Sequence, residues 1–579
     1  MLGSLGLSSW RELNVAEIRK LGRTPGGSVP PRWKDGDVLV VPFEFLESLS
    51  ELDSVTNVRS LRLPPGIKNV FLVGFKPLER LERTILEMFL DKKACLRHVA
   101  TGSLMSFSRK KDICGAFSGL EIQCQDPTPS WGLSAVSLHS EEISPILQSD
   151  GAYIMLCLKQ QGLNVYMLLT SKLADIEQIV SRNLEVRQCL LGLVAPYMML
   201  KYLLHGSGWL PGPCFANIIF DDPPLARKYG LADFRIIAER LVERRLAMTL
   251  AFIPWNYRRG TKRSIDFFKD AQNTISICIH GCNHTKSEFG GSDEMRLNGL
   301  AALAVERMEA LKRRTGLSYS RSMVFPQGRF SARAMAALKQ NDYLAVFNTE
   351  LKDATGEIQV RVKDLLHPAV MNYHCLPLFL RRKLCDGFPN LALDLLFNKP
   401  CIIVTHHDDY QENHETVWRL ADLLNEAQPR LEWQSLTHIA THCNLLRRTP
   451  FGEYAIHTFA RTVNLDILNE HPKANCMLVK QETHPKDIRA VLPNGEAAQT
   501  SIVDVGIAVR IPEDSGIRSV EFVFQGESVP SNITLSSREY FSAWLRRSLS
   551  EARDNYLSRS RALKWIARFV KRKILGWFL

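Results

Sequence analysis

The amino-acid sequence predicts an α/β protein whose largest part is a distorted (β/α) barrel, and three observations carry this prediction. Between residues 212 and 445, short runs rich in Val, Ile and Phe alternate with helical patterns, as in a parallel sheet covered by helices. Acidic residues and histidines stand at the ends of several of these runs, where the chemistry of such folds gathers. The sequence pattern changes on both sides of this segment, and 579 residues exceed a single core, so we expect flanking domains.

The part before the barrel predicts a small domain and a linker. Residues 1–185 combine β-branched apolar runs with helical spacing and predict a small α/β domain of unknown role. Residues 186–211 predict a helical linker. Its apolar stretch from Cys189 is broken by Pro196 and Lys201 and is shorter than the roughly 20 residues of a membrane-spanning helix. We therefore expect a buried helix here.

Two further parts follow the barrel. Residues 450–535 contain closely spaced strand-like runs and the turn pair Asn494-Gly495, which predict an accessory β-sandwich-like domain. Residues 536–579 end in a segment where Arg and Lys recur at helical spacing, largely opposite aromatic and aliphatic residues. This pattern predicts a basic amphipathic helix. Peripheral contact with an anionic membrane is the first interpretation of that helix, and docking on the protein's own core is the alternative.

The composition is that of an ordinary soluble globular protein, with 45% hydrophobic and 23% charged residues. The net charge of +12 points first to the basic C-terminal segment, and no motif for reading nucleic acid is present. The 13 cysteines are scattered without a Cys-x-x-Cys pair, which favours a reducing compartment. The first residues lack the pattern of a secretory signal. We therefore expect a cytoplasmic protein, with peripheral attachment to the inner face of the membrane as an option.

Two of the strand ends supply the donors of a metal site. The run ANIIF ends in Asp221 and Asp222, and a later run ends in His280, with His284 four residues further on. One carboxylate and two histidines form the three-ligand set of a catalytic zinc or similar ion. The second carboxylate can then act as general base. The two prolines after Asp222 predict a loop that leaves both aspartates exposed at the strand end.

Two more strand ends complete the set. One run leads into Pro326-Gln327-Gly328, and another ends in THHDD, which contains His406 and His407. A histidine across the site can protonate a leaving group. Each motif also has a plain alternative, because Asp-Asp-Pro-Pro is often a turn and paired histidines are often part of a polar loop. Their occurrence on successive strands of one βα domain favours a site.

This ordered set resembles the polysaccharide deacetylase superfamily, also called the NodB-homology domain or carbohydrate esterase family 4. The resemblance covers residues 212–445 and implies a distorted (β/α) barrel and a metal-dependent deacetylase. The implied roles are general base for Asp221, metal ligands for Asp222, His280 and His284, and general acid for His406, with His407 as the runner-up.

Departures from the family pattern indicate a divergent member. The family's third motif carries an arginine two residues before its proline, and Val324 stands there in this chain. Gly281 occupies a position that is commonly Ser or Thr. Arg329 is one candidate for the missing arginine. The candidate substrate-binding residues are Pro326, Gly328, Arg329 and His407.

Three functions remain open at this point. The first is a metal-dependent hydrolase that cleaves the linear C–N amide bond of an N-acetylated sugar or polysaccharide precursor in bacterial surface-polysaccharide metabolism. Its metal would be Zn²⁺, with Co²⁺, Ni²⁺ or Mn²⁺ as alternatives. The second is an inactive glycan-binding or scaffold protein of a polysaccharide assembly system. The third is a glycosidase that uses two carboxylates on a related barrel.

Overall fold

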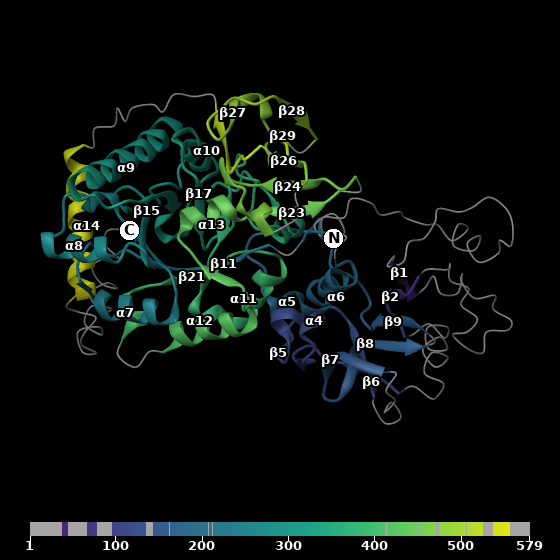
Figure 1. The fold of residues 1–579 in the computed structure, drawn as a ribbon. Coiled ribbons are helices and arrows are strands. Elements are labelled where there is room, and N and C mark those ends of the chain that lie inside the picture. Colours follow the sequence, from purple (N-terminus) through teal and green to yellow (C-terminus); the bar gives the residue numbers. More distant parts are fainter. Residues whose placement is uncertain are drawn as a thin grey trace, which may run out of the picture. The chain divides into compact units, whose positions relative to one another are not determined.

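The chain divides into two compact units, each described here by itself. Unit 1 comprises Met1–Glu177 with Leu184–Leu210, and unit 2 comprises Gln178–Asn183 with Pro211–Leu579. The computed structural model describes residues 38–43, 67–77, 95–134, 143–160, 162–205, 208–210, 212–411, 415–449, 451–470, 474–504, 506–513, 515–524 and 536–555 (Figure 1).

Unit 1 is built on a mixed nine-stranded sheet in the order β1-β2-β9-β8-β7-β4-β5, with β3 and β6 joined to it through β8. Strands β1, β2 and β9 run parallel, and the other pairs are antiparallel. Its strands are β1 (Val38–Pro42), β2 (Asn69–Val73), β3 (Leu96–Val99), β4 (Leu104–Phe107), β5 (Glu121–Gln123), β6 (Ser130–Ser134), β7 (Ile143–Ser149), β8 (Ala152–Gln160) and β9 (Leu163–Leu168).

The helical segment after this sheet packs within unit 1. It consists of α5 (Val186–Cys189), a π-helical turn (Leu190–Val194) and α6 (Ala195–Leu203). The carboxylate of Asp126 accepts hydrogen bonds from the backbone N–H groups of Leu191 and Gly192 at 2.8 and 2.9 Å. Most of α6 is buried, as expected from its apolar sequence. Within the described residues no helix is both long enough and apolar enough to span a bilayer.

Unit 2 contains the predicted parallel barrel-like sheet, in the order β19-β17-β16-β15-β14-β11-β21-β20, with β22 beside β11. Every pair in it is parallel. The strands are β11 (Cys214–Asp221), β14 (Met248–Phe252), β15 (Ile275–His280), β16 (Ser320–Val324), β17 (Ala345–Asn348), β19 (Leu378–Leu380), β20 (Arg382–Lys383), β21 (Cys401–Thr405) and β22 (Leu431–Trp433).

One short segment joins the two ends of this sheet. Strand β19 pairs with β17, strand β20 pairs with β21, and only Arg381 separates β19 from β20. The segment therefore draws the sheet into a ring. The central strands are buried on both faces, which is why their sequences are continuous apolar runs. The α/β class and the barrel-like sheet are confirmed.

Helices cover the sheet between its strands. They are α7 (Phe234–Arg244), α8 (Lys262–Asp270), α9 (Glu294–Thr315), α10 (Ala332–Gln340), α11 (Gly387–Leu396), α12 (Thr416–Ala427) and α13 (Leu436–His442). Several begin at a side chain that caps the first turn. The capping oxygens of Asp233, Asp293 and Ser331, for example, accept backbone N–H bonds within the first turns of α7, α9 and α10.

The remainder of unit 2 consists of two small sheets and a helix. The five-stranded sheet contains β23 (Leu445–Arg448), β24 (Tyr454–Thr458), β26 (Cys476–Gln481), β28 (Thr500–Val503) and β29 (Gly506–Ile511), and the three-stranded sheet contains β25 (Thr462–Asn464), β27 (Ile488–Pro493) and β30 (Ser519–Phe524). Helix α14 (Ser537–Asn555) packs on the barrel. Residues 556–579, which carry most of the predicted basic amphipathic helix, lie outside the described residues. In the part of the chain that the structure describes, no two cysteines form a disulfide bond.

Candidate metal centre

The two aspartates at the end of β11 point into different surroundings. Asp221 is the last residue of β11, and Asp222 follows with a φ of 73°. Few residues other than Gly, Asn and Asp adopt this left-handed conformation readily. The side chain of Asp221 is 8% exposed and that of Asp222 is 23% exposed. The expectation that the prolines leave both aspartates exposed is therefore wrong for Asp221, which is the last inward residue of a buried strand.

Asp221 is buried because Arg381 neutralises it. Nη1 of Arg381 donates to both carboxylate oxygens, at 2.8 and 3.1 Å, and the arginine side chain is 3% exposed. Arg381 is the residue between β19 and β20, so the closure of the sheet carries it to the end of β11. Arg329 is exposed. The arginine that contacts the candidate base is thus Arg381, which our sequence reasoning missed.

A sequence signal for Arg381 was present. The apolar run LPLFL ends in Arg381 and Arg382, just as the runs before Asp221 and His280 end in polar residues. The strand-end rule that selected the aspartates and histidines therefore also applies to this arginine pair.

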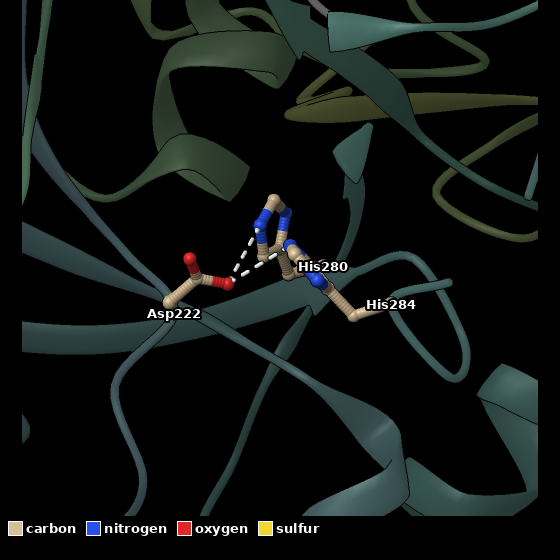
Figure 2. A group of neighbouring side chains, drawn as sticks. All are labelled: Asp222, His280 and His284. Carbon is tan, nitrogen blue, oxygen red and sulfur yellow. Dashed lines mark ion pairs between the residues drawn. The ribbon is translucent and has the colours of Figure 1, made fainter. Parts of the chain in front are cut away.

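Three donor side chains converge beside Asp221. Figure 2 shows Asp222, His280 and His284 turned toward one another. Oδ1 of Asp222 lies 3.3 Å from Nε2 of His280 and 3.0 Å from Nε2 of His284. One donor atom from each residue falls within 4.8 Å of the other two. The structure therefore brings together the three residues that the resemblance assigns to the metal.

The hydrogen bonds of these residues fit a cation. Nδ1 of His280 lies 2.9 Å from the carbonyl oxygen of Val324, which can only accept, so Nδ1 carries the proton. The lone pair of neutral His280 is then on Nε2, facing Asp222. Oδ1 of Asp222 is buried and receives no hydrogen bond of acceptable geometry. Lone pairs that face one another in a buried site match the donor set of a divalent metal.

The loop that carries His284 is held by a second carboxylate. Glu288 accepts hydrogen bonds from the backbone N–H groups of Cys282, Asn283 and His284, at 2.9, 2.7 and 3.2 Å. Gly281 has a φ of 63°, and a Cβ there would lie 2.5 Å from Cγ of Pro326 and 2.7 Å from Oε2 of Glu288. These contacts explain why glycine follows the first histidine. They also show that the ring of Pro326 packs closely against Gly281, which directly follows His280.

The charges around Asp222 favour its ionised form. Burial opposes a negative charge there, but when His284 and His280 are protonated their charges and hydrogen bonds outweigh burial and hold the pKa of Asp222 well below its usual value; a bound cation would take the place of those protons. Burial raises the pKa of the neighbouring Cys282. This cysteine is therefore a buried neutral thiol, and its sulfur accepts a hydrogen bond from Arg307 at 3.4 Å.

The two histidines after β21 lie in different environments. Phe220 pairs with Thr405, the last residue of β21. His406 is the first residue after β21 and is exposed, whereas Asp221 is buried, so contact of His406 with the site stays a prediction. Nε2 of His407 instead lies 3.4 Å from Asp554 of α14. A Cβ at Gly230 would lie 2.5 Å from the His407 ring, so only glycine fits there.

The predicted substrate-binding residues are spread around the site. Pro326 and Gly328 are buried, and Asn348 donates to the carbonyl of Gly328 at 2.9 Å. These two residues shape the loop after β16. Arg329 is exposed. Substrate contact by any of them stays a prediction.

Comparisons with known proteins return carbohydrate deacetylase structures. No family model matches this sequence, and no curated protein does. The crystal structure of the carbohydrate deacetylase Agd3 is 8% identical, with 81% of this chain and 92% of that chain covered and a TM-score of 0.40. A putative polysaccharide deacetylase from Mycobacterium smegmatis is 14% identical, with 41% of this chain and 92% of that chain covered and a TM-score of 0.29.

A catalytically altered relative is among the matches as well. The carbohydrate esterase family 4 pseudoenzyme from Bacillus anthracis is 10% identical, with 38% of this chain and 63% of that chain covered and a TM-score of 0.23. The chain is thus similar to members of the superfamily that its motifs resemble. Because these TM-scores lie below 0.5, the function proposed next rests on the motifs and on the geometry of the site.

Proposed function

We propose that this chain is a metal-dependent hydrolase that removes the acetyl group from an N-acetylated sugar or glycan by cleaving its C–N amide bond. The observation that carries the proposal is the convergence of Asp222, His280 and His284, whose donor atoms lie within 4.8 Å of one another, with Nδ1 of His280 held by the carbonyl oxygen of Val324. Asp222, His280 and His284 would hold the ion. A divalent ion at this position would polarise the amide carbonyl and acidify a water molecule.

The remaining residues divide the proton transfers between them. Asp221 is the general base in this proposal, because it lies next to the ligand Asp222 and Nη1 of Arg381 donates to both of its carboxylate oxygens. Asp221 takes the proton from the attacking water. His406 is the general acid in this proposal, which is supported by its position directly after β21, the strand that pairs with β11. It gives a proton to the departing amine.

Arg381 bears directly on the choice between an enzyme and an inactive scaffold. Val324 stands where the family's third motif carries an arginine, and this departure favoured the inactive scaffold. Arg381 restores a guanidinium partner for Asp221 from another strand. This pairing supports an active site, although a surface-polysaccharide precursor as substrate and a cytoplasmic location stay predictions.

Metal content and acetate release test the proposal together. Elemental mass spectrometry of the full chain should find about one divalent ion, most often zinc, and none in the Asp222→Ala, His280→Ala double variant. The wild type should release acetate from N-acetylglucosamine oligosaccharides, and the His406→Ala variant should lose roughly 100-fold or more in kcat while keeping its metal.

Two results would contradict the proposal. Absence of metal from the wild type even after incubation with zinc would leave the glycan-binding scaffold as the better interpretation. Turnover of a glycosidic bond without metal would favour the glycosidase. His407→Ala serves as the matched control for His406→Ala, and a larger loss of kcat from His407→Ala would reassign the general acid.

A further inference from the structure

Helix α14 lies across the end of the barrel that carries the candidate site. Its Glu539 accepts a hydrogen bond from Arg296 at 2.7 Å, and the rings of Tyr540 and Trp255 lie 4.7 Å apart. Near its other end, Asp554 accepts a hydrogen bond from Tyr229 at 2.6 Å. Trp255 follows β14, Arg296 follows β15 and Tyr229 follows β11, so α14 contacts the loops at the carboxyl ends of the strands (Figure 1).

Helix α14 buries charged side chains and exposes apolar ones, the opposite of an ordinary surface helix. Its buried positions are Ala543, Arg547 and Asp554, whereas Phe541 and Trp544 are exposed. A surface helix ordinarily buries its apolar stripe. Helix α14 instead turns charged side chains toward the barrel end, which indicates that this inner side has a task other than forming a core.

Arg547 is the least compensated group on that inner side. Its side chain is 3% exposed, and within the described residues its Nε and Nη2 atoms have no hydrogen-bond partner. The nearest carboxylate oxygen, Oε1 of Glu551, is 4.0 Å away and already accepts a hydrogen bond from Arg259. A buried guanidinium without partners is costly to the fold. The free donors of such a group are suited to an anion that arrives with a ligand.

The surroundings place these donors near the candidate metal site. Arg546 precedes Arg547 and is half-buried. Burial lowers the pKa of Arg546, and the next influence is the charge of Asp222, which raises it. Tyr229, which is hydrogen-bonded to α14, responds to the charges of both Asp222 and Arg547. Arg546 is therefore within electrostatic range of Asp222, and Arg547 is the next residue of the same helix.

We propose that Arg547, assisted by Arg546, binds an anionic group of the substrate, so that the substrate class is an acetylated sugar that carries a phosphate or a carboxylate. This inference rests on the proposed function for the position of the sugar. The planar guanidinium can donate from Nε and Nη2 to two oxygens of one anion, a geometry shared by phosphate and carboxylate groups. A neutral acetylated sugar would leave these donors unsatisfied.

Equilibrium binding to the full chain tests the inference independently of catalysis. Titration calorimetry compares N-acetylglucosamine with N-acetylglucosamine 1-phosphate and with N-acetylmuramic acid, which carries a carboxylate. We expect one of the anionic sugars to bind about 10–100-fold more tightly than the neutral one, and the tighter of the two identifies the anion. Equal affinity for all three sugars would overturn the inference, even if the chain releases acetate from neutral glycans.

The variants separate recognition from a structural role. Arg547→Met should abolish the preference for the anionic sugar, Arg547→Lys should retain part of it, and Arg538→Met, on the exposed side of the same helix, should leave it unchanged. Because Nε and Nη2 of Arg547 have no hydrogen bond and its ion pair with Glu551 is long, at 4.0 Å, Arg547→Met should keep or raise the Tm. A lowered Tm with an unchanged preference would assign Arg547 to structure and overturn the inference.

A last experiment tests whether the anion binds at the metal ligands rather than on α14. Inorganic phosphate is titrated into wild type and into the His280→Ala variant. Retained binding in His280→Ala, with loss in Arg547→Met, supports a receptor on α14. The reverse pattern would place the anion on the metal and overturn the inference.

Discussion

Replacing Arg381 by methionine tests how the candidate base is held in the site. The substitution retains an unbranched side chain of similar length but removes both hydrogen bonds to Asp221, at 2.8 and 3.1 Å. Breaking a buried ion pair by removing one partner costs about 3–5 kcal/mol. A domain of 150–250 residues loses about 2–4 °C in Tm per kcal/mol. Because unit 2 is larger, we expect a decrease of roughly 3–10 °C in its Tm.

The same change should slow catalysis. Without the guanidinium, the carboxylate of Asp221 loses both of its hydrogen bonds and the group that orients it. The kcat for acetate release should therefore fall roughly 10-fold or more, because a misplaced catalytic group can cost about 100-fold. Adding Asp221→Asn to Arg381→Met should restore part of the stability but none of the activity, because neither charge then remains.

The adjacent residue offers a matched control. Arg382 forms a buried ion pair with Asp394, at 2.8 and 2.7 Å, away from the donor set. Arg382→Met should lower the Tm by a similar amount and leave kcat close to the wild-type value. Wild-type stability in Arg381→Met, or an equal loss of kcat in Arg382→Met, would refute the reasoning.

Two further predictions concern the loop after β15 and the stability in acid. Gly281→Ala should cost about 1–3 kcal/mol of folding free energy and reduce the amount of bound metal, because of the positive φ and the close contacts at this position. Gly291 has open space around it, so Gly291→Ala should change neither quantity. Equal metal content in the two variants would contradict the steric argument. Burial, then the stacked His442, lower the pKa of His438 to about 4. The pKa of a histidine in the unfolded chain is about 6.5. The folded protein therefore keeps its full stability above about pH 6.5 and loses stability as the pH falls toward 4, because the unfolded chain then binds a proton that folded His438 does not. The loss of folding free energy is at most about 3 kcal/mol, or about 1–2 kcal/mol after solvent screening. His438→Gln should therefore reduce the difference between the urea midpoints measured at pH 7 and at pH 5. An unchanged difference would show that His438 is not the source of the instability in acid.

The sequence was sufficient for features that depend on local pattern. Continuous apolar runs can only be buried strands, so the barrel-like sheet and the positions of Asp221, Asp222 and His280 at its strand ends could be predicted. Parallel strands bring their carboxyl ends to one edge, and this rule alone predicts that the aspartates and His280 lie together. The spacing of His284 from His280 completed the donor set.

The tertiary structure decided which groups meet across long stretches of chain. Arg381 is 160 residues from Asp221, and only the segment that joins the two ends of the sheet brings them into contact. Asp554 is 325 residues from Tyr229. The position of α14 over the strand ends depends on packing against several loops at once. Periodicity and propensity report on neighbours along the chain, whereas ion pairs and coverage of a site depend on the closure of the whole barrel, so the base's partner and the inner side of α14 became visible only in the fold.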